Sequence, residues 1–155
     1  RKESSAASDV YKRQGYYQGR ICQTIDIGKI INYEGSQREI DVFGLLPNKL
    51  FISECKGYNH KVSLEEVEIW LTQKVPVIRK WILDQPSISN RELVFEFWST
   101  GGFTEDARKF LERRKSNTTK YEIEFYNLDE IVVKSKEINS KKFTEILREY
   151  YIKDI

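Results

Sequence analysis

Two strand-like runs that carry charges follow each other within residues 39–56, "EIDVFGLL" and "LFISECK", with only "PNK" between them. Their β-branched and aromatic residues favour strands, and proline and asparagine favour the tight turn of a hairpin. Glu39, Asp41, Glu54 and Lys56 lie inside these runs. Buried charge is costly unless it is paired or binds a metal. The hairpin therefore either exposes one face to solvent or lies around a metal ion.

The expected register of this hairpin brings the charges together. Side chains two apart in a strand point the same way, so Glu54 and Lys56 share one face, Cys55 takes the other, and Asp41 goes with Phe43. A turn at "PN" sets positions whose numbers add to about 95 opposite each other, which puts Asp41 across from Glu54. Two carboxylates this close repel, and a divalent cation removes that penalty. Mg²⁺ suits the pair because it prefers oxygen ligands and uses one or two carboxylates, and we expect Mn²⁺ to substitute for it.

The ordinary alternative is a solvated sheet face with a cross-strand ion pair, which is worth less than ~1 kcal/mol. Against this alternative, "LFISEC" is apolar enough for a central strand with both faces covered. A lysine beside a metal can orient the attacking water or help to deprotonate it, and can stabilise developing charge. Asp41, Glu54 and Lys56 therefore match the chemistry of phosphodiester hydrolysis.

Strands are expected through the first part of the chain. Residues 21–33 are rich in β-branched side chains and predict a strand, broken at Gly28. "EGSQ" at 34–37 predicts a turn, and the hairpin strands follow over 38–46 and 50–56.

A helix is expected after the hairpin. Ser63 followed by Glu66 three residues later is a capping box, which predicts the helix start. Pro76 interrupts the run and should kink or break the helix. Apolar residues recur at helical spacing, namely Leu64, Val67, Leu71, Val75, Ile78 and Ile82.

The remaining elements complete an alternating pattern. Residues 92–98 and 121–126 predict strands, and residues 130–134 extend or follow the second of these. Thr104 caps a helix between them, and residues 140–152 predict a closing amphipathic helix. The order β-β-β-α-β-α-β-α predicts an α/β fold, a mixed central sheet flanked by helices.

Composition bounds the class of protein. The 155 residues suit one domain, and no apolar run approaches the roughly 20 residues of a membrane helix. Cys22 and Cys55 have no metal or redox spacing, so we expect free thiols and a cytoplasmic protein, prokaryotic or viral in a host cell. Residues 1–14 contain "SAASDVYKRQ", which resembles a translated adaptor sequence of metagenomic assemblies. We interpret them as non-native, or else as a disordered tail, and residues 15–155 as a single domain that has lost its N-terminal part.

Global charge gives no support for nucleic-acid binding. Residues 1–14 hold four basic and two acidic side chains, so the 26 basic and 24 acidic residues of the whole chain fall to 22 of each without them. Any basic footprint for a nucleic acid must then be local.

The hairpin resembles a known family. Asp41, twelve intervening residues and then Glu54-Cys55-Lys56 are similar to the motif of the PD-(D/E)XK, or restriction-endonuclease-like, nuclease superfamily, in its Mrr-like and Holliday-junction-resolvase-like branches. "STGGFTEDARKFL" at 99–111 also resembles Mrr-like domains. The resemblance covers roughly residues 25–130. It implies a restriction-endonuclease-like fold, metal binding by Asp41, Glu54 and the main-chain carbonyl of Cys55, and handling of the water by Lys56.

The chain departs from the family pattern in two places. Ile40 stands where many members have proline. The helix that normally precedes the first strand, and that often brings a glutamate to the site, is not visible. Glu39 is the alternative considered for that role, as a substitute or outer ligand.

Five further residues are candidates for contact with DNA: Ser99, Thr100, His60, Lys61 and Lys74. Amides beside Ser99 and Thr100, at a strand end before a helix, could hold phosphate, and a tight turn is the alternative. For His60 and Lys61, an ordinary loop is the favoured interpretation. For Lys74, a solvated helix face is the favoured interpretation.

The sequence therefore predicts a Mg²⁺-dependent DNA endonuclease, with DNA preferred over RNA on the resemblance alone. Two alternatives stay open, a catalytically inactive nucleic-acid-binding or scaffold module on the same fold and an RNA-cleaving member. A homodimer would suit the cutting of two strands.

Overall fold

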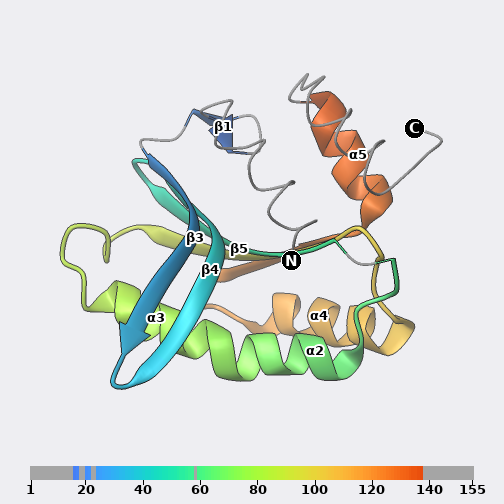
Figure 1. Ribbon diagram of the computed structural model, residues 1–155, viewed down its shortest axis with the longest axis horizontal. Coiled ribbons are helices and arrows are strands. Elements are labelled where there is room, and N and C mark those ends of the chain that lie inside the picture. Colours follow the sequence, from blue (N-terminus) through green and yellow to red (C-terminus); the bar gives the residue numbers. More distant parts are fainter. Residues whose placement is uncertain (1–15, 18–19, 22–23, 58, 138–155) are drawn as a thin grey trace.

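A five-stranded mixed sheet forms the centre of the molecule. The computed structural model describes residues 16–17, 20–21, 24–57 and 59–137 (Figure 1). The order across the sheet is β3-β4-β5-β6-β7, and β1 and β2 pair separately. Neighbours are antiparallel from β3 to β5 and parallel from β5 to β7. The strands are β1 Tyr16–Tyr17, β2 Arg20–Ile21, β3 Thr24–Tyr33, β4 Ser36–Leu45, β5 Lys49–Lys56, β6 Glu92–Ser99 and β7 Glu122–Tyr126.

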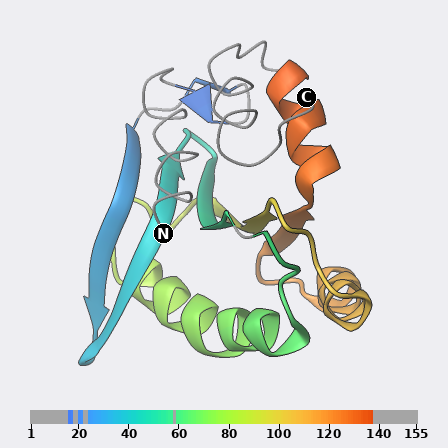
Figure 2. The ribbon, with the colours of Figure 1, turned by 45° about the vertical axis from the view of Figure 1, so that its right-hand side comes forward.

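Helices make the crossovers that parallel neighbours require. A continuous helical run of α2 (Leu64–Ile69), η1 (Trp70–Lys74) and α3 (Val75–Leu83) joins β5 to β6. Helix α4 (Glu105–Asn117) joins β6 to β7, and α5 (Leu128–Glu137) follows β7. Figures 1 and 2 show α2, α3 and α4 on one face of the sheet and α5 on the other side. The expected mixed α/β sheet flanked by helices is confirmed.

The hydrophobic core lies between the sheet and the helices α2, α3 and α4. Leu50 and Ile52 of β5 and Phe95 of β6 point into it and meet helix residues such as Val67 and Ile78, all nearly inaccessible to solvent. These side chains alternate along their strands with residues outside the cluster, as expected for one covered face. The helix-facing side of β5 is therefore the side that carries Glu54 and Lys56.

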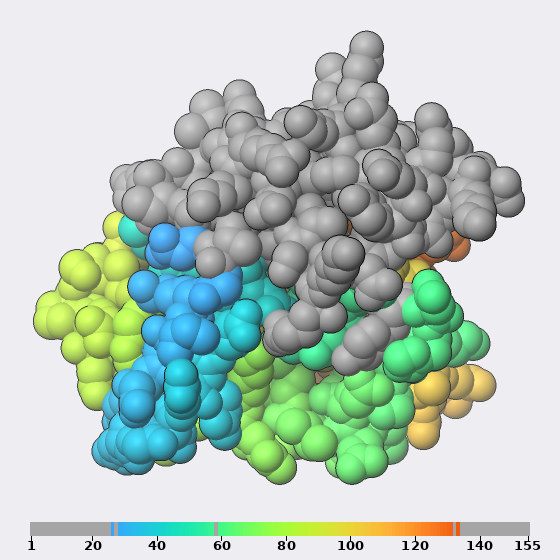
Figure 3. Space-filling view, in the orientation of Figure 1, coloured from blue at the N-terminus to red at the C-terminus, as the bar shows by residue number. Residues whose placement is uncertain are grey.

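The turn of the β3–β4 hairpin is tighter than the sequence predicts. Its turn consists of Glu34 and Gly35, with φ of 49° and 84°, as in the two-residue turn that matches strand twist. The expected turn over 34–37 is wrong at its end, because Ser36 already pairs with Tyr33. Figure 3 shows this hairpin, blue to cyan, at the surface of the molecule.

The predicted break at Gly28 is wrong, because β3 is continuous from Thr24 to Tyr33, and the hairpin bends at Gly28 instead. Gly28 has φ +67° and lies between the pairs Ile27↔Val42 and Lys29↔Ile40, so it faces Asp41 across the ladder. Ile40 joins the same core cluster as Phe43, three positions later. The expected strict alternation of side chains along β4 is therefore wrong over this stretch.

The helix after β5 begins as predicted and continues past its proline. Ser63 and Glu66 form the predicted capping box. Pro76 lies two residues after the end of η1, a wider π-helical turn in which the Val75 amide donates to the carbonyl of Trp70. The wider turn makes room before a residue that has no N–H and crowds the preceding turn. The expected break is therefore replaced by a π segment.

Residues 130–134 are helical, and their prediction as a strand is wrong. They lie within α5, whose start is fixed by a reciprocal cap between Asn127 and Glu130. The Glu130 amide donates to Asn127 Oδ1 at 3.0 Å, and the Asn127 amide donates to Glu130 Oε1 at 3.2 Å. The β-branched residues after Glu130 favour a strand only weakly, and the cap outweighs them. The helix expected over 140–152 and the tail of residues 1–14 lie outside the described residues.

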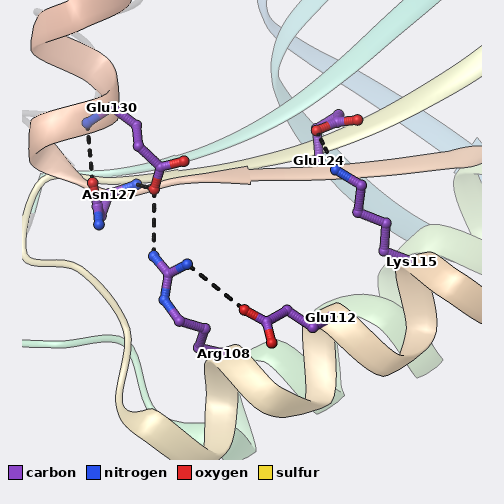
Figure 4. Close-up of polar contacts among 6 residues, drawn as sticks. All are labelled: Arg108, Glu112, Lys115, Glu124, Asn127 and Glu130. Carbon is purple, nitrogen blue, oxygen red and sulfur yellow. Dashed lines mark hydrogen bonds and ion pairs between the residues drawn. The ribbon is translucent and has the colours of Figure 1, made fainter.

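Polar contacts attach α4 to β7 and α5 (Figure 4). Arg108 Nη2 lies 3.3 Å from Glu130 Oε1, and Lys115 Nζ lies 2.9 Å from Glu124 Oε2. The Arg108 guanidinium also lies over the ring of Phe125, 5.3 Å from its centroid. Across the ranges that the structure describes, no helix is long and apolar enough to cross a membrane.

Candidate active site

Asp41 is buried against the backbone of β5. The β4–β5 ladder runs from Leu45↔Leu50 to Val42↔Ser53, so Asp41 and Glu54 are the next positions along the two strands, as the sequence register predicts. Asp41 Oδ2 accepts a hydrogen bond of 2.9 Å from the Cys55 amide. Because that nitrogen is about 2.4 Å from the Cα of Glu54, the Asp41 oxygen lies within about 5.3 Å of that Cα.

Glu54 has an ammonium group on each carboxylate oxygen. Lys56 Nζ lies 3.2 Å from Glu54 Oε2, and Lys74 Nζ donates to Glu54 Oε1 at 2.5 Å. The Glu54 side chain is 8% exposed, whereas those of Lys56 and Lys74 are 22% and 17% exposed. A carboxylate this shielded from water needs such partners. The two lysines therefore pair with both oxygens of Glu54 beside the cavity described next.

A cavity of about 170 Å³ opens at these charges, between β5, β6 and the helical run. The Trp70 and Phe97 rings form part of its wall and meet edge to face, with centroids 5.2 Å apart. Glu66, besides its capping role, faces the same space. The lining residues are Glu54, Lys56, Glu66, Ile69, Trp70, Lys74 and Phe97.

Lys74 lies in the site rather than on a solvated helix face, so that expectation is corrected. The sequence contained the signal for this position. Lys74 follows Leu71 by three residues and precedes Ile78 by four, which places it on the apolar stripe of the helix. A charge on such a stripe faces the sheet, and Glu54 is the partner it meets there.

The other predicted DNA contacts gather at the adjoining edge. His60 and Lys61 are exposed in the loop after β5. That loop is joined to the loop after β6, because the Val62 amide donates to the Gly102 carbonyl at 2.9 Å. Parallel strands β5 and β6 thus end side by side, an edge where ligand sites commonly lie in α/β sheets.

Ser99 and Thr100 make the contacts of a tight turn. Ser99 is fully buried, and its hydroxyl donates to the Gly102 carbonyl at 2.9 Å. The Thr100 amide donates to the Lys56 carbonyl at 3.1 Å. The two residues fix the chain beside Lys56, and these contacts match the tight-turn alternative.

Glu39 lies two residues before Asp41 on β4, where it pairs with Ile30 of β3. A Cβ built at Gly28 would meet Glu39 Oε1 at 3.7 Å, so this carboxylate lies beside the bend in the hairpin. Within the described part of the chain, no three histidine, cysteine, aspartate or glutamate side chains converge closely enough to hold a metal. Cys55 is a buried free thiol, and Cys22 lies outside the described residues.

The residues present fit Mg²⁺ under one condition. Mg²⁺ in phosphate-handling sites commonly uses one or two carboxylates and completes its shell with water and substrate oxygens. Asp41 and Glu54 supply two carboxylates on neighbouring strands, and the Cys55 carbonyl between Glu54 and Lys56 is a further oxygen. The condition is that Glu54 exchanges an ammonium partner for the metal, because both of its oxygens are engaged.

Comparison with known proteins finds a similar fold in one solved structure of unknown function. No protein-family model matches the chain, and no curated protein matches it. A crystal structure of a protein of unknown function, AF1548, superposes with a TM-score of 0.57 at 13% sequence identity. The match covers 86% of this chain but 64% of that one, so this chain spans less than two thirds of its neighbour's length. At this identity, the likeness concerns the fold alone.

Proposed function

We propose that the chain is a restriction-endonuclease-like nuclease that hydrolyses DNA phosphodiester bonds with Mg²⁺, or with Mn²⁺ in its place. One observation carries the proposal. Asp41 binds the Cys55 amide, next to Glu54, while Lys56 reaches the second oxygen of Glu54. This places Asp41 against the backbone of β5 beside Glu54, with Lys56 paired to Glu54 at a cavity, and it supports the arrangement that the resemblance to PD-(D/E)XK nucleases implies.

Each residue has a chemical task in this proposal. Asp41 and Glu54, with the Cys55 carbonyl, would hold the Mg²⁺ ion, and Glu39 remains the alternative outer ligand. Bound there, Mg²⁺ would polarise the phosphoryl group and stabilise its developing charge. Lys56 would orient the attacking water by hydrogen bonding. Its ammonium would also stabilise the negative charge that grows on the phosphate oxygens.

The surroundings support a nucleic-acid substrate. The exposed His60 and Lys61 and the turn at Ser99 and Thr100 lie at the edge where β5 and β6 end, next to Lys56. The ammonium of Lys61 there would contact the phosphate backbone. DNA is preferred over RNA on the family resemblance alone. We propose a cytoplasmic enzyme, and a homodimer would allow it to cut both strands.

The engagement of Glu54 favours a second candidate, a binding module without activity. Both oxygens of Glu54 already have ammonium partners, which would lower the affinity of the site for a metal. In such a module, Lys56 and Lys74 would neutralise Glu54, and DNA would bind without being cut.

Cleavage assays separate the candidates. Purified protein is incubated with Mg²⁺ or Mn²⁺ and with double-stranded, single-stranded and branched DNA and RNA, alongside Asp41→Asn, Lys56→Met and the exposed control Lys80→Met. We expect cleavage of DNA and a loss of at least ~100-fold in Lys56→Met. Cleavage of RNA alone indicates the RNA-cleaving member. Binding without cleavage by wild type indicates the inactive module, and equal cleavage by wild type and Asp41→Asn refutes the proposed site.

A further inference from the structure

Lys74 occupies one oxygen of the carboxylate to which a metal should bind. Its Nζ lies 2.5 Å from Glu54 Oε1, and its side chain is 17% exposed. The residue comes from η1, the π-helical turn before Pro76, on the helix face that packs against the sheet. A divalent ion coordinated by Glu54 would lie about 2.1 Å from a carboxylate oxygen. The ion and this ammonium would then stand within a few ångströms of each other.

Like charges at such a distance repel strongly in a site shielded from water. Glu54 therefore cannot hold both partners on Oε1 in their best positions. Lys56 does not create the same conflict, because it lies at Oε2 and at the longer distance of 3.2 Å. A metal bound at Glu54 must displace Lys74. Conversely, the ammonium of Lys74 must lower the affinity of Glu54 for the metal.

We propose that Lys74 is a built-in competitor of the divalent cation for Glu54, and that its displaced ammonium then binds a phosphate of the DNA. The inference rests on the proposed function, because it assigns this lysine a role in the same site. Lys74 is a positioning residue in the metal-free protein, and it becomes a substrate-binding residue when Glu54 is taken by the metal.

The charges around the cavity agree with such an exchange. In the described part of the site, Glu54 and Glu66 balance Lys56 and Lys74, and the adjacent Asp41 adds one negative charge. A divalent cation makes the sum positive by one, and a phosphodiester group returns it to zero. The displaced ammonium thus gains an anionic partner only when metal and DNA are both present. This coupling would keep the metal weakly bound until substrate arrives.

A purely structural counter-ion would behave differently. If Lys74 only neutralises Glu54, its removal lowers the stability of the metal-free protein and leaves DNA binding unchanged. Competition requires that the same substitution has two opposite effects: metal binding becomes tighter and DNA binding becomes weaker. The proposal can therefore be tested without measuring catalysis.

Mn²⁺ is titrated calorimetrically into wild type, Lys74→Met, Lys74→Gln and Lys74→Arg, with Lys80→Met as the control at an exposed position of the same helical run. We expect Lys74→Met and Lys74→Gln to bind Mn²⁺ at least about fivefold more tightly, and Lys74→Arg and Lys80→Met to match wild type. Lys74→Gln keeps amide donors for Glu54, so it guards against misfolding of Lys74→Met. A cooperative thermal melt confirms that each variant is folded.

Duplex DNA binding is then measured by fluorescence anisotropy in Ca²⁺, over a series of salt concentrations. We expect the affinity of Lys74→Met to fall at least threefold and its salt dependence to decrease by about one phosphate contact. Unchanged or weaker Mn²⁺ binding by folded Lys74→Met and Lys74→Gln overturns the competition, and unchanged DNA binding overturns the exchange.

Failure of this inference and failure of the proposed function are distinguishable. Cleavage by wild type without tighter Mn²⁺ binding in the variants refutes the competition alone. Tighter Mn²⁺ binding in the variants without any cleavage by wild type supports the competition and refutes the nuclease. Absence of Mn²⁺ binding in every protein refutes the competition together with the metal site.

Discussion

Asp41 has two roles that a pair of substitutions can separate. Its carboxylate accepts the buried Cys55 amide at 2.9 Å, and it supplies one of two proposed metal-binding groups. Asp41→Asn keeps a carbonyl oxygen of the same size and position for the amide but removes the charge. Asp41→Ala removes both. The two variants should therefore differ in stability and agree in their loss of activity.

The expected magnitudes follow from the burial of this contact. Asp41 is 5% exposed and Cys55 is equally buried, so no bulk water replaces a lost acceptor. Leaving a buried amide without a partner costs about 1–3 kcal/mol, and a hydrogen bond to a charged group is worth about 1.5–3 kcal/mol. We expect Asp41→Ala to lower the free energy of unfolding by about 2–3 kcal/mol. Asp41→Asn should lower it by less than about 1 kcal/mol, because the bond persists and repulsion with Glu54 disappears.

The assay combines urea denaturation in EDTA with cleavage of DNA in Mg²⁺. Loss of an outer partner of a metal site costs about 10–100-fold, so loss of a direct ligand should cost at least ~100-fold in both variants. Equal destabilisation by Asn and Ala would refute the structural role given to the Cys55 bond. Full cleavage by Asp41→Asn would refute its role as a ligand, whatever its stability.

Two further substitutions test contacts away from the cavity. The Ser53 hydroxyl donates a hydrogen bond of 2.8 Å to Glu96, which is completely buried on the sheet face opposite the helices of the core. Ser53→Ala should therefore lower the free energy of unfolding, measured in urea, by about 1–3 kcal/mol. The control Ser87→Ala, at an exposed position, should leave it unchanged. The hydrogen bond from Thr104 lowers the pKa of Asp106 at the start of α4. Its contribution to stability is therefore present above the unfolded pKa of about 3.9 and is lost as pH falls through the folded value. Asp106→Asn should be less stable than wild type at neutral pH, and the difference in urea midpoint should vanish in acid; a difference independent of pH would contradict this assignment.

The hairpin at the site was predictable because its signals are local. A proline–asparagine turn between two strand-forming runs fixes which positions face each other. The observed pairs Leu45↔Leu50 and Val42↔Ser53 keep the predicted register. The capping box at Ser63 and the N-cap at Thr104 are equally local, since each depends on residues within one turn. Such features need no knowledge of the rest of the fold.

Features that depend on distant partners were harder to predict. Helix α5 contains a β-branched run that favours a strand, and only the cap at Asn127 indicates a helix. Whether Pro76 breaks its helix or induces a π turn depends on packing against the sheet. Lys74 belongs to the same class, because its role is defined by Glu54, twenty residues earlier. Its place on the apolar stripe was visible, but the partner that makes the charge tolerable was not.

The end of the β4–β5 ladder determines where Asp41 contacts β5. Pairing between them ends at Val42↔Ser53, whereas β5 stays paired with β6 through Lys56↔Ser99. In the described sheet, the ladder with β6 thus continues beyond the ladder with β4. Asp41 satisfies the Cys55 amide with its side chain just beyond the end of the ladder, opposite the bend at Gly28. Pairing with β6 through Lys56↔Ser99 holds Glu54 and Lys56 in place at the cavity, whose wall on that side includes Phe97. The end of the β4–β5 ladder thus places the Asp41 carboxylate on the backbone beside Glu54, where continued pairing would have given the Cys55 amide a backbone partner instead.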